Sequence, residues 1–246
     1  MPVLAPPAPA LILPPAYCLV TLREAGDAFA HACAVAEVAG AGTFVWARRF
    51  DVLDIAVVLE PEEPLASARR AFLVAMVALA DAVGVHGTPE MSATFAWPDT
   101  LLYDGARLGG GRLGWPDGCA EGETPAWLVF GAMLIASKHG AGDPGLTPDS
   151  TSLEDERFEP DAGARIAESF AGHLMAAFDA LQDEGFGPVA AGYAARLACA
   201  PDERAVIERN GDLLVHGGDG AQRRIALAAA LREPSWLDPA TGTPRL

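Results

Sequence analysis

The stretch FAWPDTLLYDGARLGGGRL, residues 95–113, contains three short apolar segments separated by turn residues. Trp97-Pro98 marks a corner after the first segment, and Asp104-Gly105 is a dipeptide that commonly joins two antiparallel strands. The stretch therefore predicts strands at 95–97, 100–103 and 108–113. Considered alone, the three consecutive glycines at 109–111 indicate an ordinary hairpin that allows close packing.

Apolar segments on both sides of this hairpin predict further strands and helices. Before it we expect a strand at 17–22, a helix at 24–38, strands at 43–47 and 55–59, and a helix at 64–83. After it we expect a strand at 127–135, helices at 161–183 and 188–197, and a three-stranded meander at 206–207, 212–215 and 223–227. Residues 2–15 predict an extended, proline-rich arm, and residues 139–150 predict a loop.

Composition excludes several classes of function. The chain has 246 residues and a formal net charge of −16, which argues against nucleic acid and against an anionic membrane surface as partners. Its four cysteines and five histidines show no metal-ligand or disulfide spacing, so reduced thiols in the cytoplasm are the expectation. Lys138 is the only lysine, so any mechanism that needs an ammonium group must use it. The N-terminus lacks the basic region of a signal peptide.

Several motifs resemble those of the biotin/lipoate A/B protein ligases. Trp97-Pro98 is similar to the family's Lys-Trp-Pro-Asn-Asp segment, and Arg107-Leu-Gly-Gly follows Trp97 at the spacing of the family's catalytic lysine. Residues 42–47, 54–61, 130–135 and 151–153 resemble further family segments in the same order. The resemblance implies an α/β (α+β) fold, with a mixed sheet flanked by helices. It implies a ligase-like domain at 1–200 that includes the arm, and a small SH3-like β domain at 201–246.

The departures from the family pattern concern activation of the acid. In the resemblance, Arg107 stands where the family has its catalytic lysine, Ala96 replaces the lysine before Trp97, and Asp99 replaces an asparagine. Arginine keeps a positive charge but does not deprotonate, and Asp99 would repel a phosphate. The family's glycine- and arginine-rich loop over the adenylate is reduced to RRFD at 48–51, about a dozen residues shorter. Classical binding of ATP and Mg²⁺ is therefore not favoured.

The resemblance supplies the candidate site. Arg107 is the candidate catalytic residue, and no metal site is expected. The predicted ligand contacts are Trp46, Trp97, Asp99, Arg107, Gly109, Gly110, Gly131 and Ala132. The alternative for the two tryptophans is packing in the core. The implied ligand is a small carboxylic acid, namely biotin, lipoate or a fatty acid, and a biotinyl or lipoyl carrier domain is the implied protein partner.

Three functions remain open. The first is a pseudoenzyme that binds the acid or the carrier without adenylation. The second is an active ligase or acyltransferase that uses Arg107 in a rebuilt site. The third is a non-enzymatic scaffold whose pocket has collapsed around Trp46 and Trp97. A thioester mechanism would need Cys119 with Lys138, but the acidic neighbours of Cys119 disfavour its thiolate. Trp97-Pro98 and the glycine triplet favour an open pocket over a collapsed one.

Overall fold

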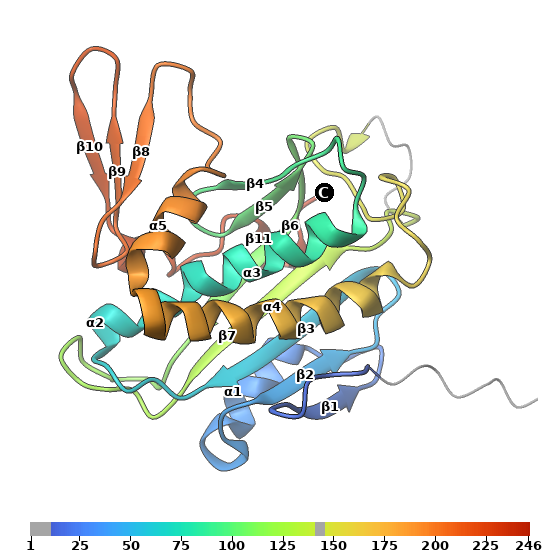
Figure 1. The fold of residues 1–246 in the computed structure, drawn as a ribbon. Coiled ribbons are helices and arrows are strands. Elements are labelled where there is room, and N and C mark those ends of the chain that lie inside the picture. Colours follow the sequence, from blue (N-terminus) through green and yellow to red (C-terminus); the bar gives the residue numbers. More distant parts are fainter. Residues whose placement is uncertain (1–10, 141–145) are drawn as a thin grey trace, which may run out of the picture.

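A seven-stranded sheet forms the centre of the protein (Figure 1). The structure is a computed structural model that describes residues 11–140 and 146–246. The strand order is β1-β2-β3-β7-β6-β5-β4, and only β1 and β2 are parallel neighbours. The strands are β1 Cys18–Leu22, β2 Thr43–Ala47, β3 Val52–Leu59, β4 Ala93–Ala96, β5 Thr100–Tyr103, β6 Ala106–Gly114 and β7 Leu128–Ile135. The expected mixed sheet is confirmed.

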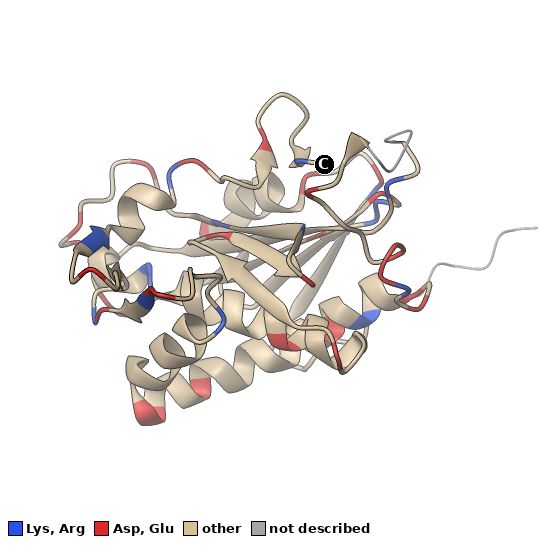
Figure 2. Ribbon diagram, turned by 90° about the horizontal axis from the view of Figure 1, so that it is seen from above, with Lys and Arg blue, Asp and Glu red and all other residues tan. Residues whose placement is uncertain are grey.

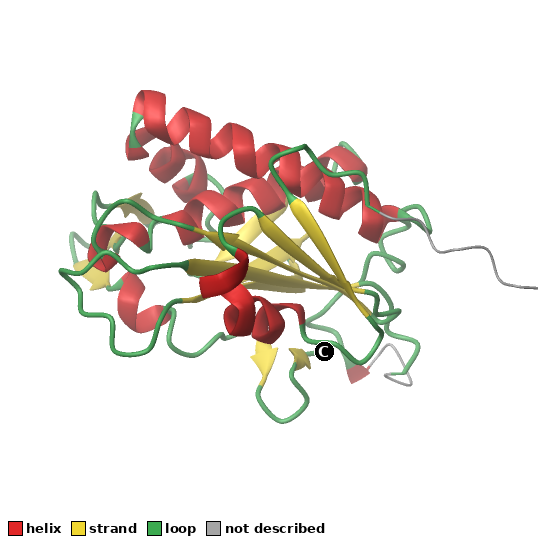
Figure 3. Cartoon of the chain, turned by 90° about the horizontal axis from the view of Figure 1, so that it is seen from below, coloured by secondary structure: helices red, strands yellow, loops and turns green. Residues whose placement is uncertain are grey.

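One face of the sheet, the α3/α4 face, is covered by long helices (Figure 3). They are α3 (Ala71–His86) and α4 (Ala162–Glu184), with α5 (Phe186–Ala194) following α4. The helix α3 buries ten of its side chains, because it lies between the sheet and the other two helices. Phe130 of β7 packs between Phe72 of α3 and Phe170 of α4, with ring centroids 5.9 and 5.6 Å away.

The opposite face, the α1 face, carries a single short helix, α1 (Ala28–Ala39). Asp27 caps it by accepting a hydrogen bond from the Ala30 amide at 2.9 Å, and Gly40 ends it at φ +76°. Its buried residues are Ala28, Ala32 and Ala36, spaced four apart, so that the helix backbone lies close to β2, β3 and β7. The sheet is therefore flanked by helices on both faces (Figure 3).

The hairpin predicted at 95–113 is confirmed with small shifts of its bounds. Asp104 and Gly105 both have positive φ, as a two-residue turn between twisted strands requires. The Trp97–Pro98 peptide bond is cis, and the corner it makes separates β4 from β5. The Tyr193 hydroxyl of α5 donates to the Pro98 carbonyl, so this corner is held against the α3/α4 face.

The helix predicted at 64–83 is two helices in the structure, α2 (Leu65–Ala68) and α3. The amides of Arg70 and Phe72 bond to carbonyls three residues back instead of four, and this tighter winding interrupts the helix at Arg69-Arg70. The other predicted helices and strands are present, with boundaries shifted by a few residues. None of the helices in the two described ranges is long and apolar enough to cross a membrane. The predicted arm and loop fall partly on 1–10 and 141–145, outside the described residues.

The small C-terminal β domain begins with a three-stranded antiparallel sheet. It consists of β8 Arg204–Ile207, β9 Leu213–His216 and β10 Gln222–Ile225. A short helix, α6 (Leu227–Ala230), and a two-stranded ladder of β11 Leu237–Asp238 with β12 Thr243–Pro244 follow. Residues 231–246, called here the C-terminal segment, pack back onto β5 and β6 through the fully buried Trp236. A domain boundary at residue 200 stays a prediction.

Candidate functional site

The candidate site lies on the α1 face of the sheet, where β6 passes between α1 and the C-terminal segment. Side chains alternate along a strand, so Gly110, Arg112 and Gly114 of β6 point to this face. Their neighbours agree, because a Cβ on Gly110 would meet Trp236 and one on Gly114 would meet Phe29. The site is thus bounded by the first turn of α1 at one end and by Trp236 at the other.

Arg112 supplies the positive charge of this site. Its side chain is 14% exposed, and Nη2 lies 2.8 Å from the Asp27 carboxylate at the start of α1. Its guanidinium also stacks over the Phe29 ring, with Cζ 4.2 Å from the ring centroid. The Asp27 side chain remains 46% exposed, so the pair is open to solvent on one side. Arginine in this planar, stacked arrangement is suited to a carboxylate ligand.

Phe29 occupies the space over two glycines of the sheet. A Cβ on Gly131 of β7 would lie 2.6 Å from a ring carbon of Phe29, and one on Gly114 would lie 2.9 Å from another. The register pairs Gly131 with Arg112, so the ring lies against two adjacent strands. The absence of side chains at these glycines is what allows Phe29 to pack here.

A buried carboxylate lies beside the same helix turn. Asp54 of β3 is 1% exposed and accepts a hydrogen bond from the Ala28 amide at 3.1 Å. Burial raises the pKa of Asp54 to about 6, although the Ala28 amide acts in the opposite direction. The N-terminus of α1 therefore presents amide groups to Asp54 and to Asp27, which lie at the first turn of one helix.

The C-terminal segment is fixed to the Trp97-Pro98 corner through Asp99. This carboxylate is 1% exposed and accepts hydrogen bonds from the Ser235 amide at 2.8 Å and the Ser235 hydroxyl at 2.7 Å. Trp236 Nε1 donates to the Gly111 carbonyl at 2.9 Å. Asp99 therefore faces protein donors, and burial raises its pKa while these hydrogen bonds lower it.

The glycine triplet of β6 is filled by protein atoms. A Cβ on Gly109 would clash with the Met133 backbone of β7, one on Gly110 with Trp236, and one on Gly111 with Met76. The three glycines thus allow the close packing expected of an ordinary hairpin. Because protein atoms fill the space beside them, they do not support an open pocket.

The structure separates the predicted site residues into three places. Trp46 and Ala132 belong to the core on the α3/α4 face, because they share strand parity with Phe44 and Phe130. Trp97 packs edge-on against Tyr193, with its Nε1 buried and without a hydrogen-bond partner among the described residues. The remaining predicted contacts lie on the β5–β6–β7 part of the sheet: Asp99, Arg107, Gly109, Gly110 and Gly131.

Arg107 lies apart from the α1 end of this face. Its Nη1 donates to the Arg245 carbonyl of the C-terminal segment at 2.9 Å. It precedes Arg112 by five residues, about 17 Å along an extended strand. Arg107 and Gly131 are therefore not brought to one point, and the assignment of Arg107 as catalytic stays a prediction.

The remaining basic residues considered from the sequence are engaged elsewhere. Arg49, in the short β2–β3 connection, pairs with Asp51 at 2.7 Å and lowers the pKa of that carboxyl. Lys138 pairs with Asp155 at 3.0 Å and donates to the Ser150 carbonyl at 2.8 Å. The Cys119 thiol donates to the Ala120 and Glu123 carbonyls in the loop before β7, whereas Lys138 lies after β7. These two residues do not form a pair.

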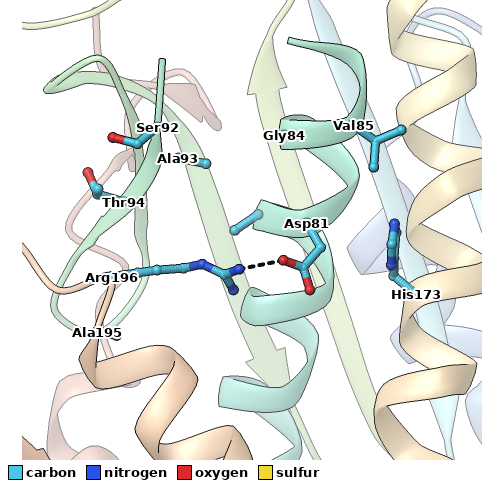
Figure 4. Close-up of a pocket in the computed structure, with 10 residues that line it drawn as sticks. Asp81, Gly84, Val85, Ser92, Ala93, Thr94, His173, Ala195 and Arg196 are labelled. Atoms are coloured by element: carbon cyan, nitrogen blue, oxygen red, sulfur yellow. Dashed lines mark hydrogen bonds and ion pairs between the residues drawn. The ribbon is translucent and has the colours of Figure 1, made fainter. Parts of the chain in front are cut away.

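A separate hollow of about 610 Å³ lies on the α3/α4 side of the molecule (Figure 4). The Asp81–Arg196 ion pair, at 2.6 Å, crosses it, and His173 of α4 lines its opposite side. It contains none of the sequence-predicted site residues, and its two charges neutralise each other. Over residues 11–140 and 146–246, no group of three or more His, Cys, Asp or Glu side chains is placed to hold a metal ion.

Asp27, Phe29, Asp54, Arg112 and Trp236 were not predicted from the sequence. For Arg112 a signal exists, because the spacing Gly110-x-Arg112-x-Gly114 places one cation between two glycines on one strand face. The other four residues reach the site through tertiary contacts, for which the sequence offers no local pattern.

Comparison with known proteins assigns the class of this fold. A mixed sheet with long helices on one face and a short helix over β3 and β7 is the fold of biotin protein ligases. The biotin protein ligase of Aquifex aeolicus matches with a TM-score of 0.63 at 13% identity, over 85% of this chain and 94% of that one. A biotin protein ligase-like protein of unknown function from Silicibacter sp. matches with a TM-score of 0.78 at 26% identity, over 91% of this chain and all of that one.

The chain belongs to the biotin/lipoate A/B protein ligase family, whose model matches residues 13–195. A biotin–[acetyl-CoA-carboxylase] ligase from Paracoccus denitrificans is 30% identical over 166 residues. That match covers 65% of this chain and 66% of the relative, just under two thirds of its length.

Proposed function

We propose that this chain binds a small carboxylic acid, of the biotin, lipoate or fatty-acyl type, without activating it through ATP. The acid would lie on the α1 face, with its carboxylate on Arg112 and its apolar part over Gly131 and Gly114. The proposed setting is the cytoplasm, and a biotinyl or lipoyl carrier domain is the proposed protein partner.

The arrangement of Arg112 carries this proposal. Its guanidinium already holds a carboxylate, that of Asp27, in a half-exposed pair stacked on an aromatic ring. A ligand carboxylate can exchange with Asp27 while the ring of Phe29 turns away from the two glycines. The proposed binding step is therefore a displacement of the side chains of Asp27 and Phe29 in the first turn of α1.

The residues present do not fit ATP as the family resemblance would require. Arg107, in the lysine position, donates to the C-terminal segment, and Trp236 covers Gly110 beside it. Arg49, in the shortened loop, is paired with Asp51. These contacts support the absence of adenylation over the rival of an active ligase that uses Arg107.

The filled glycines favour a second candidate, a non-enzymatic scaffold. In that case Phe29 and Trp236 are permanent parts of the core, and no acid enters. This filling differs from a collapse around Trp46 and Trp97, since neither tryptophan faces Gly131.

Calorimetric titration with biotin, lipoate and octanoate separates the two candidates. Acid binding predicts that one of the three binds the parent and that Arg112→Gln weakens it at least about tenfold, because a charged hydrogen-bonded pair is lost. Phe29→Ala should tighten binding, because the ring no longer has to be displaced. Arg165→Gln, which removes an exposed ion pair of α4, is the matched control and should leave binding unchanged.

Two results count against acid binding. If neither the parent nor Phe29→Ala binds any of the three acids, the scaffold is the better account. If an acid binds the parent and Arg112→Gln equally well, the carboxylate does not lie on Arg112.

A further inference from the structure

The second half of α4 carries an apolar stripe that the rest of the described chain covers only in part. The fully buried side chains of α4 lie at or before Leu174. Met175, Phe178 and Leu181 continue the stripe at three-residue spacing, with Met175 36% exposed and the other two half-buried. An amphipathic helix normally buries such a stripe along its whole length.

A groove of about 580 Å³ runs beneath this stripe, between α4 and the ends of β3 and β7. Val57 and Leu128 form its floor and are fully buried. We call it the α4 groove, lined by Tyr17, Leu59, Leu128, Met175, Phe178 and Leu181. Its volume and its apolar lining suit several side chains from one face of a partner helix.

Negative charge surrounds the α4 groove. Glu60, Glu62 and Glu63 of the β3–α2 connection line one side. Glu63 is neutralised by Arg70 at 2.6 Å, so Glu60 and Glu62 supply the negative charge on this side. Glu60 accepts from the Ala41 amide and is fixed at the rim.

The end of α4 adds to this charge. Asp179, Asp183 and Glu184 are exposed there, and the last turn has no basic residue. In Figure 2 the ribbon at this end of the helix is red and not blue. Carboxylates at the C-terminal end of a helix add to the negative end of its dipole, an unfavourable arrangement that a cation relieves. Both sides of the groove thus present negative charge.

We propose that the α4 groove docks a cationic amphipathic helical segment of a partner protein. Its apolar side chains would enter between Phe178 and the floor, and its lysines or arginines would face the glutamates and the end of α4. A second copy of this chain is a poor occupant, because each copy carries a net charge of −16. An anionic membrane is disfavoured for the same reason.

This surface is independent of the proposed acid site. It lies on the α3/α4 face, whereas Arg112 and Phe29 lie on the opposite face of the same sheet. Failure of acid binding would leave the docking proposal intact, and the reverse also holds.

Fluorescence anisotropy with a labelled helical peptide tests the docking proposal. The probe is about four turns long, with leucine on one face and lysine on the other. A second peptide replaces every lysine with glutamate. The lysine peptide should bind the full chain at least about tenfold more tightly than the glutamate peptide, and added salt should weaken it. Equal binding of the two peptides would overturn the proposal, as would concentration-dependent dimerisation that blocks the peptide.

Variants locate the binding to the groove. Phe178→Ser should weaken binding of the lysine peptide about tenfold, because a central aromatic contact is lost. Met175→Ser serves if Phe178→Ser does not fold, and Val38→Ser, 94% exposed on α1, is the matched control.

Charge reversal separates local from overall charge. Glu62→Lys with Asp183→Lys should reduce the lysine preference, whereas Glu90→Lys with Asp117→Lys makes the same change in net charge away from the groove and should keep it. Equal effects of the two pairs, or unchanged binding in the folded serine variants, would contradict the proposal.

Discussion

Two glycines on neighbouring strands accommodate one phenylalanine at the candidate site. Gly131 and Gly114 would each bring a Cβ within 3 Å of Phe29, and the Arg112 guanidinium stacks on the same ring with Cζ 4.2 Å from its centroid. A resemblance in the sequence identifies Gly131 as part of a family strand. It does not identify Phe29, because nothing in its local sequence indicates which strand face the first turn of α1 will contact.

Gly131→Ala should destabilise the protein by about 1–3 kcal/mol, because the new methyl group overlaps the Phe29 ring. Urea unfolding measures the loss. The same substitution in a Phe29→Ala background should cost much less, since the overlap is gone. Gly172→Ala, at an open position of α4, is the control and should stabilise the helix by about 0.5–1 kcal/mol. An equal cost of Gly131→Ala in both backgrounds would contradict the packing described.

Asp54 should make the protein less stable as pH rises. A carboxylate paired with a cation on the surface has the opposite effect. Its folded-state pKa, about 6, lies above the unfolded value near 3.8, so the folded protein binds more protons between these values. Stability from this group is therefore present at low pH and lost as pH rises through about 6.

Unfolding of Asp54→Asn and of the parent should be compared from pH 4 to pH 7. As pH rises, the free energy of unfolding of the variant should increase relative to that of the parent. The increase should reach a few kcal/mol, because each pKa unit corresponds to about 1.4 kcal/mol. The asparagine oxygen can still accept from the Ala28 amide, so the helix cap is retained. A difference that does not change with pH would mean that Asp54 titrates normally.

At the scale of elements, the sheet and helices can be predicted from the sequence. The packing of the C-terminal segment against the α1 face of the sheet cannot. The runs at 43–47 and 127–135 and the turn at Asp104-Gly105 predict their strands correctly, because β-branched and apolar runs between turn residues have few alternatives. The break at Arg69-Arg70 was not predicted, since the apolar spacing continues through it. The return of Trp236 to β6 was also not predicted, because a lone tryptophan after a meander carries no periodicity.

Trp236→Ala should cost about 3–5 kcal/mol, because a fully buried aromatic side chain and its bond to the Gly111 carbonyl are both removed. Leu246→Ala, 47% exposed in the same C-terminal segment, should change stability by less than about 0.5 kcal/mol. Denaturant unfolding of both variants measures these effects. A loss for Trp236→Ala as small as that for Leu246→Ala would show that the segment is not part of the core.

At the scale of the whole molecule, collinear motifs were enough to identify the family, whereas the site was only partly predictable. Resemblance places Trp46, Trp97 and Gly131 in one pocket, but strand parity puts Trp46 on the opposite face from Gly131. The cation that faces Gly131 is Arg112, five residues beyond the position of the family lysine. A motif fixes register along the chain, but the contacts across a sheet depend on which face each residue takes.

The central claim is that this family member does not form an acyl-adenylate. Acid-dependent exchange of labelled pyrophosphate into ATP, with Mg²⁺ and with biotin, lipoate or octanoate, tests it most directly. The account predicts no exchange above the acid-free blank, while an active biotin protein ligase in the same assay gives a clear signal. Exchange that requires one of the acids would contradict the claim, and its loss in Arg107→Ala would assign the activity to that residue.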